Sequence, residues 1–175
     1  IENYGANVSI VGGTGDDSIV NRGVRATIDG GDGLDFIENY GANASIIGDK
    51  GDDSIINRKS GATIDSGDGA DTIGNYEGAN YALINAGAGN DSIRSWGNNS
   101  TINGGADNDS IENSGDNVSV VGGDGDDTIN SYGSSVTVDG GIGNDYLHNN
   151  GGNKVTINGD AGNDTVDNRS DSVLI

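Results

Sequence analysis

The chain has 175 residues, of which 28 are acidic and 8 basic, so its formal charge is −20; it contains 33 Gly, one His and no Pro, Cys or Met. So negative a charge argues against nucleic acid or an anionic membrane as a partner and in favour of cations. The lack of Cys excludes disulfides and thiolate metal sites, and no stretch is apolar enough for a signal peptide or a membrane-spanning helix.

The sequence repeats with a period of about 18 residues, and each period divides into two halves of nine that end in x-Ile-x. Position eight of every half, from Ile1 and Ile10 to Ile175, is Ile, Val or Leu, whereas positions seven and nine are mostly polar. This alternation is typical of a short strand with one buried face, and a strict repeat of this length is typical of a β-solenoid. We therefore expect an all-β solenoid of about ten coils, each with two short strands and a turn at each end.

The glycine-rich turn first occurs at residues 12–17, where the half-coil follows Gly-Gly-x-Gly-x-Asp-x-Ile-x. Glycine at positions two and four permits a positive φ and leaves carbonyl oxygens free to point into the turn. Aspartate replaces these glycines three times, at Asp49, Asp107 and Asp160. The predicted carbonyl donors are Gly13, Gly15, Gly31, Gly33, Gly51, Gly67, Gly69, Gly87, Gly89, Gly105, Gly123, Gly125, Gly141, Gly143 and Gly162.

Position six of this half-coil is aspartate in all nine copies, at spacings of 18, 18, 18, 20, 18, 18, 18 and 19 residues. Residues at one phase of a solenoid stack about 4.8 Å apart, so neighbouring carboxylates repel by about 1 kcal/mol even at the dielectric constant of water. A cation has to lie between them, and hard oxygen donors suit Ca²⁺ far better than Zn²⁺ or copper. The predicted metal ligands are Asp17, Asp35, Asp53, Asp71, Asp91, Asp109, Asp127, Asp145 and Asp164.

This nonapeptide, complete at Gly122–Asn130, resembles that of the repeats-in-toxin (RTX), or haemolysin-type calcium-binding, family. The resemblance implies a right-handed parallel β-roll in which each Ca²⁺ lies between loops of successive coils, held by two position-six aspartates and by loop carbonyls. Nine loops then give about eight ions along one edge, which would reduce the formal charge from −20 to about −4. If the aspartates only made Asx-turns, Asn would serve equally, yet Asn never occupies position six.

The second half-coil departs from the family, in which both half-coils bind calcium. Its position six carries no acid, being Ala26, Ala44, Ala62, Ser100, Val118, Val136 and Val173. Its position one is instead a column that predicts a ladder of side-chain amides, hydrogen-bonded from coil to coil in place of calcium. The column consists of Asn3, Asn21, Asn39, Asn57, Asn75, Ser95, Asn113, Ser131, Asn149 and Asn168. Both length irregularities of the repeat fall in this half, after Asn75 and after Asn149.

Beside the asparagine column, aromatic and arginine residues alternate in the first half of the chain, at Tyr4, Arg22, Tyr40, Arg58, Tyr76 and Trp96. Stacked on one another they predict cation–π contacts of about 0.5 to 1 kcal/mol each. The alternative is a platform for glycans. The alternation does not continue in the second half of the chain, where the same position holds Ser114, Tyr132, Asn150 and Arg169. This favours a structural role for the row over a glycan platform.

The sequence thus predicts a calcium-loaded solenoid in which residues 1–175 are a single segment of a longer array and contact its flanking repeats. The family resemblance implies a structural, non-enzymatic module of a secreted or cell-surface bacterial protein, such as an adhesin stalk or an exoprotein repeat region, that folds in extracellular calcium. No local cluster of acid, base and cation suggests catalysis. The alternative is a repetitive surface for ice or glycans on an outward row that Leu83 interrupts: Ser9, Thr27, Ser45, Thr63, Thr101, Ser119, Thr137 and Thr156.

Overall fold

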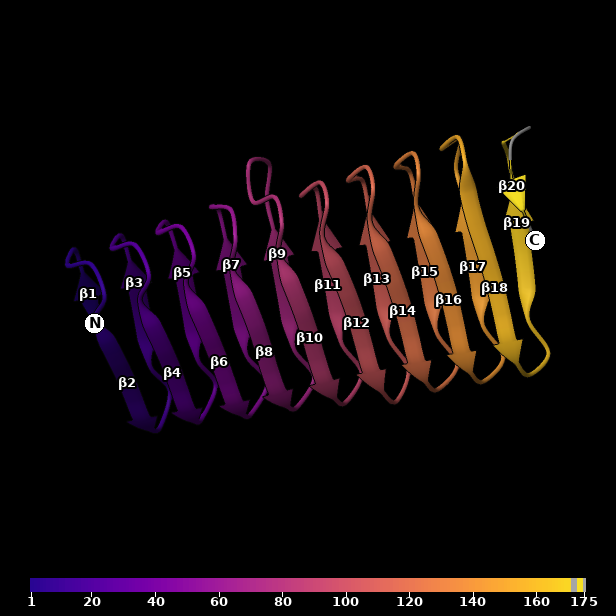
Figure 1. Cartoon of the computed structure of the whole chain (residues 1–175). Helices are drawn as coiled ribbons and strands as arrows, with labels where there is room; N and C mark the ends of the chain where they lie inside the picture. The colour runs from indigo at the N-terminus through magenta and orange to yellow at the C-terminus, as the bar shows by residue number, and fades with distance from the viewer. Residues whose placement is uncertain (171–172, 175) are drawn as a thin grey trace.

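The computed structural model describes residues 1–170, 173 and 174, which form an all-β solenoid of parallel strands (Figure 1). Within these residues the strands alternate between two 10-stranded sheets, and each strand pairs with the strand one coil further along. In Figure 1 the even-numbered strands run downward in front, the odd-numbered strands run upward behind, and each coil advances to the right, so the solenoid is right-handed. The predicted fold class is confirmed.

The odd-numbered strands form the short-strand sheet. They are β1 (Glu2–Asn3), β3 (Ser18–Asn21), β5 (Phe36–Asn39), β7 (Ser54–Asn57), β9 (Thr72–Asn75), β11 (Ser92–Ser95), β13 (Ser110–Asn113), β15 (Thr128–Ser131), β17 (Tyr146–Asn149) and β19 (Thr165–Asn168). The even-numbered strands form the long-strand sheet. They are β2 (Ser9–Thr14), β4 (Thr27–Asp32), β6 (Ser45–Lys50), β8 (Thr63–Asp68), β10 (Leu83–Ala88), β12 (Thr101–Ala106), β14 (Ser119–Asp124), β16 (Thr137–Ile142), β18 (Val155–Ala161) and β20 (Val173–Leu174). The described part of the chain has no helix that could cross a membrane.

Two unlike edges connect the sheets. The glycine–aspartate edge carries the turns that lead from a long strand to the next short strand, such as Gly15–Asp17 between β2 and β3. The asparagine edge carries the turns that lead back to the long-strand sheet, such as Arg22–Ala26. The turn between β9 and β10, Tyr76–Ala82, is two residues longer than this one and protrudes beyond its neighbours in Figure 1. The predicted length irregularity after Asn75 therefore lies on the asparagine edge.

The core is a line of aliphatic side chains, one from each strand, stacked in register from coil to coil. Ile10 lies opposite Ile28 in the long-strand sheet, and Ile19 lies opposite Ile37 in the short-strand sheet. Position eight is buried from Ile10 to Ile157, whereas Ile1 in the first coil is exposed and Val166 is half-buried. Ile175 is outside the described residues. Position six of the second half-coil, two residues before position eight, adds small apolar residues to this core. Ala82 and Val155 are among them, although the two length irregularities place them out of the strict period.

Candidate metal centre

The aspartates predicted as ligands form a column on the inner side of the glycine–aspartate edge. Each lies two residues before a buried core side chain, as Asp35 lies before Ile37, so the carboxylate points to the same side as the core. Seven are between 1 and 3% exposed: Asp35, Asp53, Asp71, Asp91, Asp109, Asp127 and Asp145. Asp17 and Asp164, in the end coils, are half-buried. The structure therefore brings the predicted acids together and buries them.

One oxygen of each carboxylate is occupied by a hydrogen bond between coils. The backbone N–H of Asp17 donates to Oδ1 of Asp35 at 2.8 Å, and the bond recurs at every step up to Asp145 and Asp164, where it measures 3.1 Å. An asparagine Oδ1 accepts such a bond equally well. This contact therefore does not explain why position six is always aspartate.

The second oxygen explains the aspartate. Oδ2 is buried without a hydrogen-bond partner in Asp35, Asp53, Asp71, Asp91, Asp109, Asp127 and Asp145. A buried charged oxygen without a partner is strongly unfavourable, so such a group is neutralised by a proton or by a cation.

The pKa of the buried aspartates shows how unfavourable the bare charge is. Burial raises the pKa of Asp53, Asp91 and Asp127 to about 6 and that of Asp109 to about 7. The backbone N–H that these residues receive lowers the pKa, and neighbouring carboxylates raise it further. The pKa of Asp35, Asp71 and Asp145 is raised for the same principal reason.

In the five of these seven coils that have Gly at position one, the unpartnered Oδ2 faces a small slot left by that glycine. A Cβ placed on Gly30 would lie 2.3 Å from Oδ2 of Asp35 and 2.9 Å from the carbonyl oxygen of Gly48 in the next coil. The long-strand ladder skips position one, since Val11 pairs with Asp29 and the next pair is Gly13 with Gly31. The position-one carbonyl is thus a candidate oxygen donor beside the carboxylate, except at Ala86, whose oxygen accepts a hydrogen bond from Ser66 Oγ at 2.7 Å. Sequence reasoning missed it, and its signal is the run of small residues at that position: Gly12, Gly30, Gly48, Ser66, Ala86, Gly104, Gly122, Gly140 and Gly159.

The predicted carbonyl donors at positions two and four point along the axis of the solenoid. A Cβ on Gly31 would lie 1.9 Å from the Gly13 oxygen, and one on Gly51 would lie 1.8 Å from the Gly33 oxygen, so these carbonyls face the next coil. Both columns adopt positive φ throughout. The three aspartates that replace glycine share this conformation, with φ of 82° at Asp49, 75° at Asp107 and 67° at Asp160, because Asp tolerates the left-handed region better than most residues.

The donors between successive coils are therefore all oxygens, one carboxylate per coil together with backbone carbonyls. Among the described residues no three Asp, Glu, His or Cys side chains come together, so a cation here relies on carbonyls as much as on acids. Ca²⁺ accepts such a mixed shell of hard donors, whereas Mg²⁺ demands a stricter octahedron and Zn²⁺ prefers nitrogen and sulfur. The residues present fit Ca²⁺.

On the asparagine edge the predicted amide ladder is confirmed from Asn3 to Ser95. Asn21 Nδ2 donates to Asn39 Oδ1 at 2.7 Å, and the last bond of the run joins Asn75 Nδ2 to Ser95 Oγ at 3.1 Å. In the described structure the next bond of this column comes only at Asn149 and Asn168, and Ser131 Oγ is buried without a partner. Ser95 Oγ accepts the bond from Asn75 but continues the column no further, so the ladder prediction is wrong between Ser95 and Asn149.

The alternating row beside the ladder forms a continuous stack. The Arg22 guanidinium lies 5.6 Å from the Tyr4 ring and 5.0 Å from the Tyr40 ring, and Arg58 lies 5.5 Å from Tyr40 and 4.8 Å from Tyr76. Trp96 stacks on Tyr76 at 5.2 Å with the planes 14° apart. The predicted cation–π contacts are confirmed. Both faces of Tyr40 and Tyr76 are covered, so these two rings offer only their edges to any glycan.

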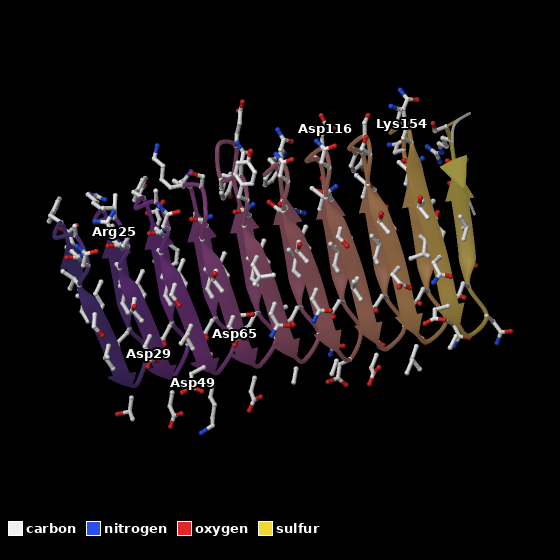
Figure 2. The ribbon with its side chains drawn as sticks, in the orientation of Figure 1. Arg25, Asp29, Asp49, Asp65, Asp116 and Lys154 are labelled. Carbon is white, nitrogen blue, oxygen red and sulfur yellow. The ribbon has the colours of Figure 1, made fainter. Side chains whose placement is uncertain are left out.

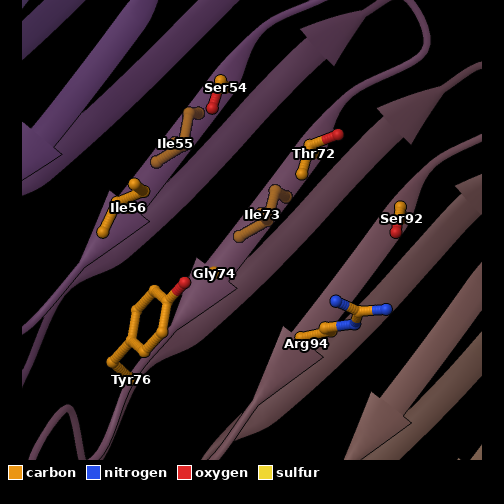
Figure 3. A pocket seen from close by; sticks show the side chains of 9 residues that line it. All are labelled: Ser54, Ile55, Ile56, Thr72, Ile73, Gly74, Tyr76, Ser92 and Arg94. Carbon is orange, nitrogen blue, oxygen red and sulfur yellow. The ribbon is translucent and has the colours of Figure 1, made fainter.

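A shallow pocket of about 140 Å³ lies on the outer face of the short-strand sheet, where Gly74 leaves a gap between Ile56 and Arg94 (Figure 3). Its other lining residues are Ser54, Ile55, Thr72, Ile73, Tyr76 and Ser92. No carboxylate lines it, and the neighbouring Asp53, Asp71 and Asp91 are buried on the inner side of the sheet. The pocket is therefore no cation site.

Fold and column together define a parallel β-solenoid with buried oxygen donors between its coils. The model of the RTX calcium-binding nonapeptide repeat matches residues 83–111, 121–153 and 155–172, with four copies. These segments are therefore similar to RTX calcium-binding repeats, and their aspartate column continues in register through the earlier coils. Searches among curated proteins and among solved structures found no match.

Proposed function

We propose that this chain is a calcium-binding structural module of a secreted or cell-surface bacterial protein, and that it folds on binding Ca²⁺. The observation that carries the proposal is the set of seven buried Oδ2 atoms without a partner, one per coil from Asp35 to Asp145. RTX repeats supply the identity of the cation. The role is mechanical rather than catalytic, as a rod segment in a stalk or an exoprotein repeat region.

In this proposal each ion lies between two successive coils. The ligands are the position-six aspartates of both coils, the glycine carbonyls at positions two and four, and the position-one carbonyl of the following coil. The column from Asp17 to Asp164 then holds about eight ions on one edge. Asn39 and its equivalents do without metal on the opposite edge, because their amides satisfy one another.

Folding depends on the ion because the apolar core is thin. Each half-coil contributes one aliphatic side chain such as Ile55, with Ala44 or a similar small residue beside the asparagine turn. Small cores of this kind generally need a metal or another crosslink. Extracellular calcium modules bind at about 10⁻⁴ to 10⁻³ M, so such a chain stays unfolded at cytosolic calcium and folds outside the cell.

The test is far-UV circular dichroism of the chain in chelator and in millimolar Ca²⁺, with Mg²⁺ as the matched control. We expect a coil-like spectrum in chelator, a β-spectrum in Ca²⁺ and little rescue by Mg²⁺, whose octahedral shell fits these turns poorly. Calorimetric titration in the same buffers measures binding directly. A chain that is fully folded in chelator, or that binds no Ca²⁺, contradicts the proposal.

A further inference from the structure

Four of the five basic residues of the N-terminal half lie on the asparagine edge, and the fifth, Lys50, pairs with Asp32 on the opposite edge. The first four turns of the asparagine edge, residues 4–8, 22–26, 40–44 and 58–62, hold four basic residues and no acid. We call these residues, Arg22, Arg25, Arg58 and Lys59, the basic edge. The opposite edge of the same coils is acidic, and Figure 2 shows Arg25 and Asp49 at opposite ends of the strands. A chain with a formal charge of −20 thus presents one local cationic surface.

The basic edge is exposed and partly rigid. Arg22 and Arg58 are held between aromatic rings. Among the described residues, the ion pair of the basic edge is that of Arg58 Nε with Glu38 Oε1 at 2.9 Å. Arg25 donates from Nε to Asn7 Oδ1 at 2.8 Å, which leaves its terminal nitrogens outward, and Lys59 is exposed. Guanidinium groups that are already fixed lose little entropy when they bind an anion.

The spacing of these cations selects the kind of anion. They occur in pairs on alternate turns, two coils or about 9.6 Å apart. Duplex DNA carries one charge per about 1.7 Å and would meet far more negative charge on the rest of the chain than it finds cations here. Single-stranded nucleic acids stack their bases on free aromatic faces, and those of Tyr40 and Tyr76 are covered. A polymer with sparse charges suits the basic edge better.

We propose that the basic edge binds an acidic polysaccharide, in which neutral sugars separate the carboxylates or sulfates. The anionic groups pair with the cations, and the intervening sugars lie along the ring edges of the aromatic row. The pocket above Gly74 adjoins this row, since Tyr76 belongs to both, and it offers Ser54, Thr72 and Ser92 hydroxyls for uncharged hydrogen bonds (Figure 3). This inference goes beyond the calcium-binding role, because it concerns the metal-free edge.

The experiment measures binding of the calcium-loaded chain to hyaluronan oligosaccharides by calorimetry, with neutral dextran, densely charged heparin and single-stranded DNA as comparisons. We expect binding to hyaluronan that weakens as salt rises from about 0.05 to 0.15 M, and none to dextran. The variant R25Q/K59Q removes two cations outside the ring stack and should weaken binding at least about threefold.

The matched control is Lys154→Gln. Lys154 occupies the same turn position as Arg25, with φ of 57° against 56°, but belongs to the C-terminal end of the asparagine edge (Figure 2). This variant should bind as the parent chain does. The proposal is overturned if R25Q/K59Q binds the acidic polysaccharide as tightly as the parent chain does. It is also overturned if the parent chain binds dextran or single-stranded DNA as tightly as the acidic polysaccharide. Calcium titration of the same preparations distinguishes this inference from the proposed function. A chain that binds Ca²⁺ but no acidic polysaccharide contradicts this inference and leaves the calcium-binding role intact.

Discussion

The aspartate at position six has two functions that its two oxygens divide between them. Oδ1 accepts the backbone N–H of the preceding coil, as Asp91 does from Asp71, and so helps to set the register between coils. Oδ2 is buried and has no partner in the protein. Asparagine retains the first function and loses the second, so substitution by Asn and by Ala separates the two.

Asp91 is the best place for this comparison because it lies in the middle of the column. We expect Asp91→Asn to lower the calcium stoichiometry by up to about two ions, since each aspartate serves the sites on both of its faces. The variant should retain its register bond and lose stability mainly when calcium is present. Asp91→Ala removes both functions and should also destabilise any calcium-free fold by about 1 kcal/mol.

Calorimetric titration and chemical unfolding of both variants provide the measurement. The control is Asn113→Ala on the opposite edge, which loses only the hydrogen bonds of its own turn to Gly115. This control should leave the number of bound ions unchanged. An unaltered ion count in Asp91→Asn would show that the carboxylate is not a ligand.

At the scale of the strand and turn, the acid column predicts an unusual dependence on pH. Burial raises the pKa of Asp53, Asp91 and Asp127 to about 6 and that of Asp109 to about 7, while an unfolded Asp titrates near about 3.9. The folded state therefore binds more protons than the unfolded state between these values. Without calcium, stability must rise as the pH falls through this window and be lost as the pH climbs above about 7.

The measurement is the folded fraction by circular dichroism, in chelator, from pH 8 down to pH 5. We expect β-structure to increase towards pH 5 in the absence of calcium. With Ca²⁺ present the trend should reverse, because protons compete with the ion for the same carboxylates. A calcium-free chain that becomes steadily less folded between pH 8 and pH 5 contradicts a buried, proton-binding column.

Periodicity made most of this architecture predictable. Ile10, Ile28 and their copies recur at one phase, so the strands, the two edges and the inward position of Asp53 follow from the sequence. Backbone donors leave no such trace, and the carbonyl of Gly48 was missed because its only signal is a small residue at position one. The failure of the ladder at Ser131 has another cause. A repeated sequence position shows which residues stack in register, but it does not show whether each side chain is long enough to reach its neighbour.

Different hydrogen bonds stabilise the asparagine edge in the two halves of the chain. The column of Asn and Ser residues in the sequence did not reveal this difference. From Asn3 to Ser95 buried amides bond to one another. Beyond this point an exposed ladder takes over three positions further along the turn, where the Asn98 N–H donates to Asn80 Oδ1 and the Asp116 N–H donates to Asn98 Oδ1, both at 2.8 Å. The inward space is then filled by Val118 and Val136 instead of Ala44 and Ala62. Apolar volume and surface hydrogen bonds replace the buried ladder.

For the whole molecule, charge is the quantity that calcium controls. Eight divalent ions would bring the formal charge from −20 to about −4, which removes most of the self-repulsion of the folded chain. Each coil contacts only its neighbours, so ions and coils are coupled along one dimension. Loss of one site therefore destabilises mainly the adjacent coils. The number of bound ions reports the loss of a site more directly than the melting temperature does, because the melting temperature also reflects the coupling between coils.

The last prediction is that all the ions lie on one edge. Nine aspartates from Asp17 to Asp164 provide about eight gaps between coils, while the inward position on the other edge holds Ala, Val or Ser, as at Ala62 and Val136, and no carboxylate. Calorimetry should find about eight Ca²⁺ per chain, and anomalous scattering from crystals grown in calcium should place them in a single row beside the aspartates. About sixteen ions, or a second row beside Asn21 and Asn39, would show that the asparagine edge binds metal and that its amide ladder is not a substitute for calcium.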